Sequence, residues 1–315
     1  MNRISIVTPT LGRPAELDGL LSNLCELETP LHELIVIDAG PPADLRTQEV
    51  VSRRRADLPF PVNYFTHARG TAIQRNAGID RATGDFIAFV DDDVRLSPRF
   101  FRVLLAELAR DVDRRVGAIV GYRTNQRTNP TGMSRWRMYR ALRLFTTFEP
   151  GRYDYETGYP INNLLQPPFS GTREVDFMTT SHALWRREVF DQGLRFDPFF
   201  RDYGVLEDAH LALSAKQRNW KLLQSGDAHC EHLQSPNART ASRKLGVKSV
   251  INYYYVFQSV AGPLRMSQKL RFWRFQAFDV MRMTASSLRR RRVDDLSFIL
   301  GKLEGVAMIA RGQLR

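Results

Sequence analysis

Three consecutive aspartates, Asp91, Asp92 and Asp93, form the segment of this sequence with the clearest capacity for chemistry. They directly follow the apolar run Phe86–Val90, and carboxylates held this close repel one another unless a cation lies between them. Mg²⁺ and Mn²⁺ prefer hard oxygen ligands and commonly bridge carboxylates to substrate phosphates. The run therefore favours a site for a metal ion and a diphosphate. The alternative is an acidic cap on the helix that Pro98 would open.

A second acidic pair, Glu207 and Asp208, precedes a segment whose alanines and leucines recur at helical spacing over residues 209–215. A carboxylate at this place could act as a general base that accepts a proton from a substrate hydroxyl group. The alternative is two acids that stabilise the dipole of a first helical turn. The residue types alone leave both interpretations open.

Two histidines, His229 and His232, lie in the short polar segment GDAHCEHLQ. A neutral imidazole could complete an oxygen-ligated Mn²⁺ site. Histidines at the surface, or held by a hydrogen bond, are more common than metal ligands. The two residues alone therefore leave metal ligation open.

Several well-known catalytic motifs are absent from the sequence. There is no GxGxxG after a strand, no GxxxxGK[ST], no HExxH and no GxSxG. These absences argue against a dinucleotide oxidoreductase, a P-loop kinase, a zinc protease and a serine hydrolase. A bound phosphate would instead be held by a metal ion and arginines.

The elements that must position these residues alternate between strand-like and helix-like segments over the first 125 residues, which predicts an α/β unit with a mostly parallel sheet. Strands are predicted at 4–7, 34–37, 62–65, 86–90 and 116–120, and helices from Pro14, over 74–82 and from Pro98. Ligands of such sheets bind beyond the carboxyl ends of the strands. Thr8, Asp38 and the three aspartates all fall at those ends.

The later chain divides into three segments. Residues 151–174 carry many prolines and glycines and predict a long mobile loop that could close as a lid. A structured block is predicted over 175–233. Beyond Pro236 the chain becomes basic, aromatic and helical, with apolar residues at spacings of three and four from Leu296 to Ala310.

The composition predicts a folded globular protein, because 43% of the 315 residues are hydrophobic. The formal charge of +12 is concentrated near one end. Residues 239–315 hold 16 Lys or Arg and 4 Asp or Glu, so that the rest of the chain is neutral overall. Such a basic helical segment, with the arginine cluster 289–292, favours attraction to anionic lipid headgroups. The alternatives are a helical cap with solvated arginines, or a self-association surface.

The two cysteines, Cys25 and Cys230, lie far apart and form no CxxC motif, which predicts reduced thiols and suits a cytoplasmic protein. Pro9 and Gly12 interrupt the first apolar stretch too early for a signal peptide. The longest uncharged run in the later chain, 249–264, is shorter than the roughly 20 residues that span a bilayer. We therefore expect neither export nor a transmembrane helix.

Taken in order, these segments resemble the family 2 glycosyltransferases of the GT-A fold over about residues 3–235. The likeness rests on four segments: SIVTPTLGRPAEL, VIDAG, QRNAGIDRATGDFIAFVDDDVRLSP and HALWRREVFDQGLRFDPFFRDYGVLEDAHLALSAKQRNW. It implies a GT-A type fold, in which a Rossmann-like, mostly parallel sheet is flanked by helices. Residues 240–315 match no motif of the family.

On the donor side, the resemblance implies that Thr8, Thr10 and Asp38 line the nucleoside pocket, where Asp38 accepts a hydrogen bond from the base. Arg75 and Arg69 would lie near the base or the diphosphate. The sequence departs from the family pattern just after Asp38, because Ala39, Gly40, Pro41 and Pro42 stand where many members have an acidic residue and a Ser or Thr.

For the acidic run, the resemblance implies that Asp92 contacts the ribose and that Asp93 binds the metal ion, Mn²⁺ or Mg²⁺. Asp91 occupies the first position of the DxD pattern and would assist either role. His232 is the preferred further metal ligand, and His229 is the second choice.

On the acceptor side, the resemblance makes Asp208 the general base and Glu207 its supporting neighbour. The expected reaction is one direct displacement that inverts the anomeric centre. The donor would be a nucleotide sugar, with a UDP-sugar favoured, and the acceptor a hydroxyl group of a glycan or a lipid-linked molecule.

The expected organisation is a GT-A catalytic domain over 1–238 followed by a basic helical extension over 239–315. Within the domain, 1–125 would form the nucleotide-binding half and 175–235 the acceptor half. The protein would be cytoplasmic and peripheral at the inner face of the cell membrane through 239–315, and its oligomeric state is left open.

Three other functions fit the sequence less well. A nucleotidyltransferase acting on a sugar phosphate would need a glycine-rich phosphate loop, which is missing. A non-catalytic scaffold of the same fold would be expected to lose the acidic run or the Glu207–Asp208 pair. A nucleic-acid binder is disfavoured because the body is neutral, its acidic cluster repels phosphates and no recognition motif is present.

Overall fold

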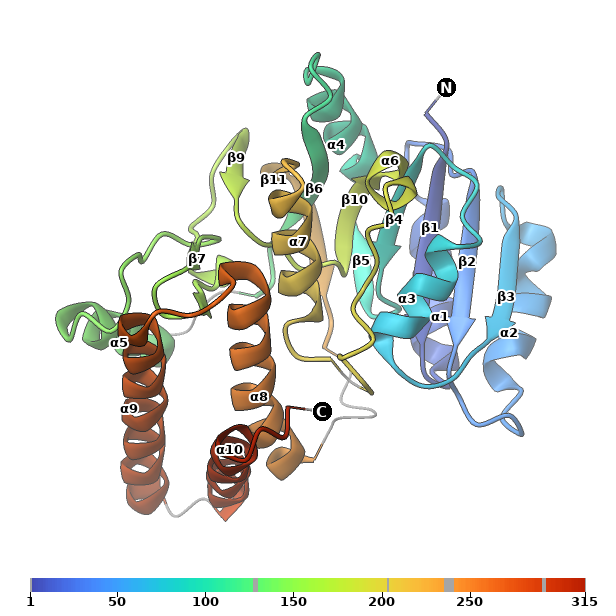
Figure 1. The fold of residues 1–315 in the computed structure, drawn as a ribbon. Coiled ribbons are helices and arrows are strands. Elements are labelled where there is room, and N and C mark those ends of the chain that lie inside the picture. Colours follow the sequence, from blue (N-terminus) through green and yellow to red (C-terminus); the bar gives the residue numbers. More distant parts are fainter. Residues whose placement is uncertain (1, 127–129, 203, 235–240, 291–292, 315) are drawn as a thin grey trace. The chain divides into compact units, whose positions relative to one another are not determined.

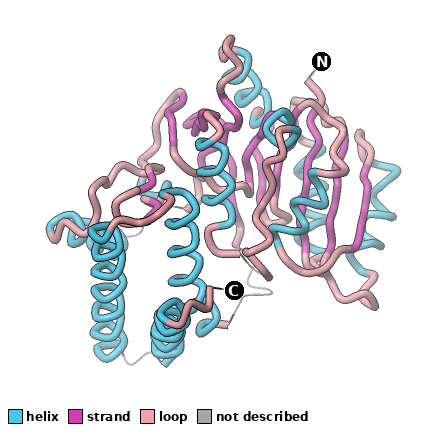
Figure 2. Tube along the Cα trace, viewed as in Figure 1, coloured by secondary structure: helices cyan, strands magenta, loops and turns pink. Residues whose placement is uncertain are grey.

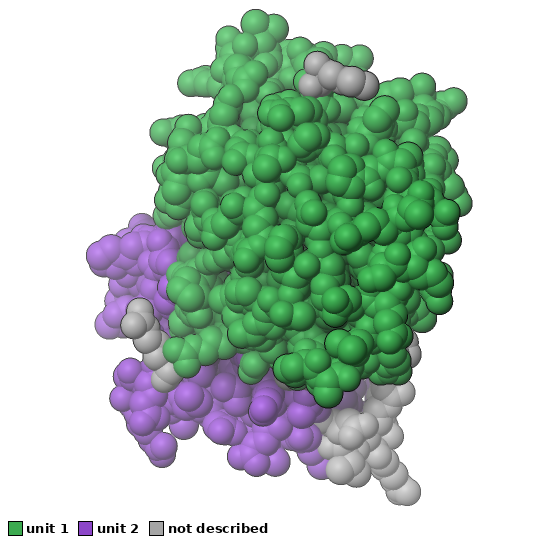
Figure 3. All heavy atoms as spheres, turned by 90° about the vertical axis from the view of Figure 1, so that its right-hand side faces the viewer, with its two compact units in different colours: residues 1–127, 166–237 green, residues 128–165, 238–315 purple. Residues whose placement is uncertain are grey.

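The computed structural model describes residues 2–126, 130–202, 204–234, 241–290 and 293–314 (Figure 2). Contacts between Cα atoms divide the chain into two compact units, coloured green and purple in Figure 3. Unit 1 comprises Met1–Arg127 and Gln166–Asn237, and unit 2 comprises Thr128–Leu165 and Ala238–Arg315. Residues 128–165 therefore belong to the same unit as the C-terminal helices. The division into domains 1–238 and 239–315 stays a prediction.

Unit 1 is built on one mixed sheet with the strand order β3-β2-β1-β4-β10-β6-β11-β5, and β9 pairs with β11 (Figure 1). Strands β1 to β4 are mutually parallel, as are β6 and β11, while β10 runs antiparallel between β4 and β6. The strand bounds are β1 Ile4–Thr10, β2 Glu33–Asp38, β3 Val62–Thr66, β4 Phe86–Val90, β5 Val94–Leu96, β6 Val116–Arg123, β9 Thr172–Val175, β10 His182–Arg186 and β11 Lys221–His232.

Helices cover both faces of this sheet. In the view of Figure 1, α1, α2 and α4 lie behind it and α3, α6 and α7 lie in front. Pro14 begins the first helix, where its missing N–H costs nothing. The helix bounds are α1 Pro14–Cys25, α2 Arg46–Arg54, α3 Thr71–Ile79, α4 Phe100–Ala109, α6 Arg187–Asp191 and α7 Glu207–Gln217, and the short 3₁₀ helix η1 spans Arg55–Asp57.

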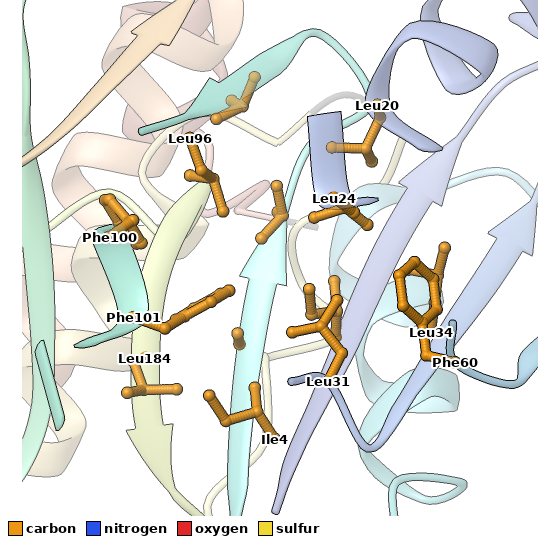
Figure 4. Packing of buried hydrophobic residues seen from close by; sticks show 14 of the residues in the cluster. Ile4, Leu20, Leu24, Leu31, Leu34, Phe60, Leu96, Phe100, Phe101 and Leu184 are labelled. Atoms are coloured by element: carbon orange, nitrogen blue, oxygen red, sulfur yellow. The ribbon is translucent and has the colours of Figure 1, made fainter. Parts of the chain in front are cut away.

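Alternate residues of β1 serve the two faces of the sheet. Ile4 belongs to the buried cluster that also contains Leu20 and Leu24 of α1 (Figure 4). Val7 points to the other face, where Gly78 of α3 approaches so closely that a Cβ there would lie 2.2 Å from Val7 Cγ1. This packing fixes the position of β1, whose carboxyl end leads into the candidate site.

Unit 2 combines helices with a small hairpin. Its elements are α5 Pro130–Ala141, β7 Tyr153–Asp154, β8 Tyr159–Pro160, the 3₁₀ helix η2 Asn163–Leu165, α8 Ser242–Ala261, α9 Met266–Arg290 and α10 Val293–Ala310. Aromatic rings form much of its core. Tyr139 of α5 meets Phe275 of α9 edge to face, with ring centroids 5.6 Å apart, and Phe145 lies 4.8 Å from Phe275.

Two close contacts fix α10 within unit 2. Gly301 packs against α8, and a Cβ there would lie 2.0 Å from the carbonyl oxygen of Arg243. Lys302 is 2% exposed, and its Nζ lies 2.7 Å from Oδ2 of Asp279 on α9. Asp279 also pairs with Arg282 at 2.6 Å, so that a buried carboxylate holds two cations.

The predicted strands at 4–7, 34–37, 62–65, 86–90 and 116–120 all form, as do the helices from Pro14 and over much of 74–82. The helix expected from Pro98 begins two residues later, at Phe100. The prediction of a long loop over 151–174 was wrong in part, since β7, β8 and most of β9 lie there. Helix α2 and strand β5 were missed. No described helix is long and apolar enough to cross a membrane.

Candidate functional site

The three aspartates lie in a tight turn that joins β4 to β5. The N–H of Val94 donates to the carbonyl oxygen of Asp91 at 3.0 Å, which closes the turn. The short strand β5 then pairs antiparallel with β11, with Val94 opposite His232. This register brings Asp93 beside a histidine that is far away in the sequence.

Asp91, Asp93 and His232 form a group that could hold a metal ion, since each offers a ligand atom and these atoms lie within 4.8 Å of one another. Nε2 of His232 lies 3.0 Å from Oδ1 of Asp93. Burial would raise the pKa of Asp93, but contacts from His232 and Arg13 outweigh burial and hold the pKa below its usual range. Two carboxylates and one imidazole suit Mn²⁺ or Mg²⁺, so the residues present fit such an ion.

Arg13, which the sequence did not single out, lies against the same aspartates. Its Nη1 is 2.8 Å from Oδ1 of Asp92 and its Nη2 is 3.2 Å from Oδ2 of Asp93. The hydroxyl of Thr10 donates to Asp92 Oδ2 at 2.6 Å. Burial raises the pKa of Asp92 to about 7, even though Arg13 and Thr10 favour its ionised form. A cation of the protein itself therefore partly neutralises the acidic run.

Asp38 organises the loops that follow β1 and β2. Its Oδ1 accepts hydrogen bonds from the N–H groups of Gly12 at 3.0 Å and Gly40 at 2.7 Å, and its Oδ2 accepts one from the Tyr64 hydroxyl at 2.8 Å. Gly40 lies so near Gly12 that a Cβ would stand 3.0 Å from the Gly12 nitrogen. The residues after Asp38 depart from the family pattern, and one of them, Gly40, lies where the two loops approach closely. A side chain at Gly40 would crowd the backbone of Gly12.

Asp208 is held by four donors at the start of α7. Its Oδ1 accepts from the Thr180 hydroxyl at 2.6 Å and from Arg75 at 3.0 Å. Its Oδ2 accepts from the Thr180 N–H at 3.1 Å and the Thr179 hydroxyl at 3.2 Å. The carboxylate is therefore oriented before any substrate arrives, which is what a general base requires.

Glu207 is buried beside Asp208. Its Oε1 accepts from the Thr71 hydroxyl at 3.1 Å, and burial followed by the charge of Asp208 raises its pKa. The preceding residue, Leu206, has a φ of 72°, a left-handed conformation that is rare for a bulky side chain. Backbone strain of this kind concentrates at functional sites, because the surrounding structure must enforce it.

Arg75 joins the two acidic groups. It is 3% exposed, and its guanidinium contacts Asp91, Asp208 and Glu207 at 3.0, 3.0 and 3.5 Å. Burial opposes its charge, but the three carboxylates raise its pKa above the usual value. The residue expected near the nucleotide thus lies between the metal-capable group and the carboxylate pair.

Thr8, Arg69 and His229 complete the set of site residues that the sequence suggested. Thr8 is fully buried, and its hydroxyl has no hydrogen-bond partner among the described residues. Arg69 is exposed in the loop before α3. His229 bonds the carbonyl oxygen of Gly226 through Nε2 at 3.0 Å and is not part of the metal-capable group.

Polar residues that sequence reasoning missed complete the site. Arg123 of β6 donates to the hydroxyls of Thr179 and Ser181 at 2.9 Å each. Gln74 donates to the carbonyl oxygens of Thr10 and Ile37, which ties the ends of β1 and β2 to α3. Their neighbours in the sequence gave no signal, because each contact joins segments far apart in the chain.

Comparisons with known proteins agree with this geometry. The sequence model described as "Glycosyl transferase family 2" matches residues 5–194. The succinoglycan biosynthesis protein ExoM of Rhizobium meliloti is 30% identical over 197 residues, which cover 57% of this chain and 61% of ExoM. The chain thus spans less than two thirds of the length of the curated relatives it matches.

Two solved structures share the fold at 15% sequence identity. A mannosyltransferase of Pyrobaculum calidifontis in complex with GDP-Man and Mn²⁺ has a TM-score of 0.57, covering 97% of this chain and 87% of that protein. GalNAc-T7 with UDP, GalNAc and Mn²⁺ has a TM-score of 0.61, covering 99% of this chain and 58% of that protein. Both likenesses establish the GT-A fold.

Proposed function

This chain belongs to glycosyl transferase family 2, and on that premise we propose that it transfers a sugar from a nucleotide-sugar donor to a hydroxyl acceptor with inversion. The observation that carries the proposal is the pairing of a metal-capable group, Asp91, Asp93 and His232, with an oriented carboxylate, Asp208, through the single guanidinium of Arg75. A metal site without a base could bind the diphosphate of a donor but could not activate an acceptor hydroxyl group. A base without a metal site could not bind the donor diphosphate, so transfer needs both groups.

On the donor side, Asp93 and His232 would hold Mn²⁺ or Mg²⁺, with Asp91 as a third ligand. Such an ion, when bound, neutralises the charge that develops on a departing diphosphate. Asp92 is proposed to contact the ribose, and Asp38 the base. The loop contacts of Asp38 support a fixed pocket wall, since three donors hold its carboxylate in place.

On the acceptor side, Asp208 is proposed to accept the proton of the attacking hydroxyl group. Direct attack from the face opposite the diphosphate inverts the anomeric centre. Glu207 would support this role, because burial and the charge of Asp208 raise its pKa and favour its neutral form. Thr179 and Thr180 keep the base oriented through their hydrogen bonds.

The donor is proposed to be a UDP-sugar, and the acceptor a glycan or lipid-linked molecule. ExoM is named as a protein of succinoglycan biosynthesis, and GalNAc-T7 was solved with UDP, which supports these choices by analogy. A cytoplasmic protein that is peripheral at the membrane would meet a lipid-linked acceptor directly. The division into a catalytic domain, 1–238, and an extension, 239–315, is part of the same proposal.

The test measures binding and reaction separately. Thermal-shift measurements with UDP-, GDP-, dTDP- and CDP-sugars, with and without Mn²⁺, should show a metal-dependent shift for one donor. That shift should disappear in Asp93→Asn and persist in Asp113→Asn, an exposed acid that serves as the control. No metal-dependent shift with any donor would contradict the proposal.

The products distinguish the alternatives. A glycosyltransferase releases a nucleoside diphosphate as the sugar is transferred or hydrolysed, whereas a nucleotidyltransferase releases pyrophosphate from a nucleoside triphosphate. A non-catalytic scaffold would bind the donor and release neither. An assay of nucleoside diphosphate release from the donor that gives the shift, together with an assay of pyrophosphate release from the matching nucleoside triphosphate and sugar phosphate, therefore decides between the three.

A further inference from the structure

One face of α9 exposes a row of large apolar side chains. Met266, Leu270, Met281 and Leu288 are 69%, 63%, 62% and 71% exposed. With 3.6 residues per turn, their spacing places them on one face of the helix, together with Ala277, which is also exposed. We name these five residues the α9 stripe.

The α9 stripe is not part of the core of unit 2. The opposite side of the helix supplies that core through Phe272 and Phe275, which are 0% and 2% exposed. The helix therefore has one apolar face that is buried and a second that is exposed. Single exposed apolar residues are normal on soluble proteins, but a continuous row marks an interaction surface.

The charged side chains that α9 itself exposes are positive. Lys269, Arg274 and Arg289 belong to the same helix, and Arg274 and Arg289 are exposed. The one acidic residue in the sequence of α9 is Asp279, which is buried and held by Lys302 and Arg282. Arg291 and Arg292, also basic, lie outside the described residues. A partner of this face must accept apolar side chains and carry negative charge.

We propose that the α9 stripe docks on an anionic lipid bilayer, with α9 lying in the plane of the surface. The apolar side chains would enter the boundary between headgroups and acyl chains, while the flanking cations reach the headgroups. A second copy of the chain fits less well, because two such faces would bring like charges together. A nucleic acid would match the charge but leaves the apolar row without a role.

The face suits attachment to a membrane surface rather than insertion across it. Its apolar row occupies one side of a helix whose other side is committed to unit 2. Binding should thus have two parts, an electrostatic part that salt screens and an apolar part that salt leaves largely intact. This inference deepens the membrane attachment in the proposed function and rests on that part of it. It does not depend on the transfer reaction, because the α9 stripe shares no residue with the candidate site.

A second exposed row tests the assignment to α9. Leu296, Leu300 and Leu303 of α10 are 42%, 55% and 50% exposed at helical spacing. These leucines lie in the same basic segment. If the C-terminal region bound lipid non-specifically through any exposed apolar side chain, both the α9 stripe and these leucines would contribute. The proposal assigns the lipid contact to α9.

The experiment is flotation of the full chain with vesicles of phosphatidylcholine alone and with vesicles that contain about 30% phosphatidylglycerol. We expect binding to the anionic vesicles, weakened by high salt. Leu270→Glu combined with Met281→Glu should reduce it by roughly tenfold or more, because both apolar contacts are lost and negative charge is added. Val112→Glu, at an apolar residue of unit 1 that is 88% exposed, is the matched control and should bind as the wild type does.

Three results would overturn the proposal. One is the absence of wild-type binding to either vesicle, and another is full binding by the α9 double variant. The third is loss of binding in Leu300→Glu without loss in the α9 variant, which would move the contact to α10. Size-exclusion chromatography with light scattering adds a fourth: a wild-type dimer that becomes a monomer in the α9 variant would assign the α9 stripe to self-association and overturn the proposal. Circular dichroism of each variant verifies folding, which these exposed positions should preserve.

Discussion

The guanidinium of Arg75 joins Asp91 to Asp208, with Nη2 3.0 Å from Asp91 Oδ1 and Nη1 3.0 Å from Asp208 Oδ1. One buried cation thus touches both the metal-capable group and the proposed base. A shift of either carboxylate should alter the distance from the guanidinium to the other one, because both carboxylates contact the same rigid, planar group.

The first prediction concerns this link. Arg75→Ala should destabilise the protein by about 3–5 kcal/mol, because it leaves the buried Glu207 and the half-buried Asp91 and Asp208 without their cation. Arg75→Lys should keep the fold but lower the transfer rate, since one ammonium cannot reproduce both contacts of the planar guanidinium. Thermal unfolding and turnover at saturating donor measure the two effects.

Arg195→Lys is the control for that substitution, because Arg195 forms a partly exposed pair with Asp80 and should tolerate lysine. Wild-type turnover in Arg75→Lys would show that the bridge between Asp91 and Asp208 does not matter for the reaction.

The second prediction separates base catalysis from binding. Asp208→Asn should lower the rate of transfer by roughly 10²- to 10⁴-fold, because an amide cannot accept the proton of the acceptor. Its hydrogen bonds to Thr179 and Thr180 can largely be kept, so donor affinity by calorimetry should stay within about threefold. Normal transfer by this variant would remove Asp208 from the role of base.

The third prediction concerns Arg13, whose guanidinium competes with any metal ion for Asp93. Arg13→Ala should strengthen Mn²⁺ binding in the absence of nucleotide by about fivefold, as expected for the loss of a competing ion pair worth roughly 1 kcal/mol. Electron paramagnetic resonance of free Mn²⁺ gives the affinity directly. Arg46→Ala, which removes a surface partner of Asp44, is the control. Unchanged or weaker binding in Arg13→Ala would contradict the competition.

The fourth prediction is a pH dependence in unit 2. Burial would raise the pKa of Asp279, but Lys302 and Arg282 outweigh burial and lower the pKa. A carboxyl whose folded pKa is depressed stabilises the fold above its unfolded pKa of about 3.9, and that stability is lost as the pH falls through the folded value. The protection of α9 and α10 against hydrogen exchange, corrected for the chemical exchange rate at each pH, should therefore fall in acid below about pH 4.

Substitutions test the same pair. Asp279→Asn should cost about 3–5 kcal/mol, because it leaves Lys302 buried without its partner. Replacing the pair together, with Asp279→Leu and Lys302→Met, should be much less harmful and should weaken the acid sensitivity. An acid response that is unchanged in the double variant would assign it to other carboxylates.

The fifth prediction concerns the contact of Gly301 with α8. Gly301→Val should destabilise unit 2 by about 1–3 kcal/mol or more, because its side chain would collide with the carbonyl oxygen of Arg243. Ala310→Val, at an exposed position of the same helix, should have little effect. Faster hydrogen exchange in α8 and α10 reports the difference, and equal exchange in the two variants would contradict it.

The sequence predicted the parts of the fold that local patterns determine. Buried strands such as Phe86–Val90 are continuous apolar runs, and Pro14 marks a helix start, so both could be recognised without a structure. Strand β5 could not, because three residues carry no periodicity. It forms because β11 provides its pairing partner.

The metal-capable group illustrates the same limit. A metal site was expected at the acidic run from its position after a strand, and the resemblance to a family singled out Asp93 and His232 as ligands. Their proximity depends on β11 continuing to His232, whereas residues after Leu223 were interpreted as a polar segment. The alternation of buried Ala228 and Cys230 with exposed neighbours is a strand signal that was present and not used.

Arg13 and Arg75 show what remained beyond prediction. Arg75 was expected near the nucleotide or its phosphates, but its partners come from the turn after β4 and from α7. Arg13 meets aspartates some 80 residues away. Contacts of this kind follow from the packing of whole elements, and no local pattern encodes them.

The construction of unit 2 from two separated stretches has a consequence for synthesis on the ribosome. Tyr139 and Phe145 are made early, yet Phe275, on which both rings pack, emerges only after more than a hundred further residues. At typical translation rates the rings wait on the order of ten seconds for their partner. During that interval the exposed rings of the nascent chain would be available for chaperone binding. The synthesis of α9 would end it, because Phe275 then covers both rings.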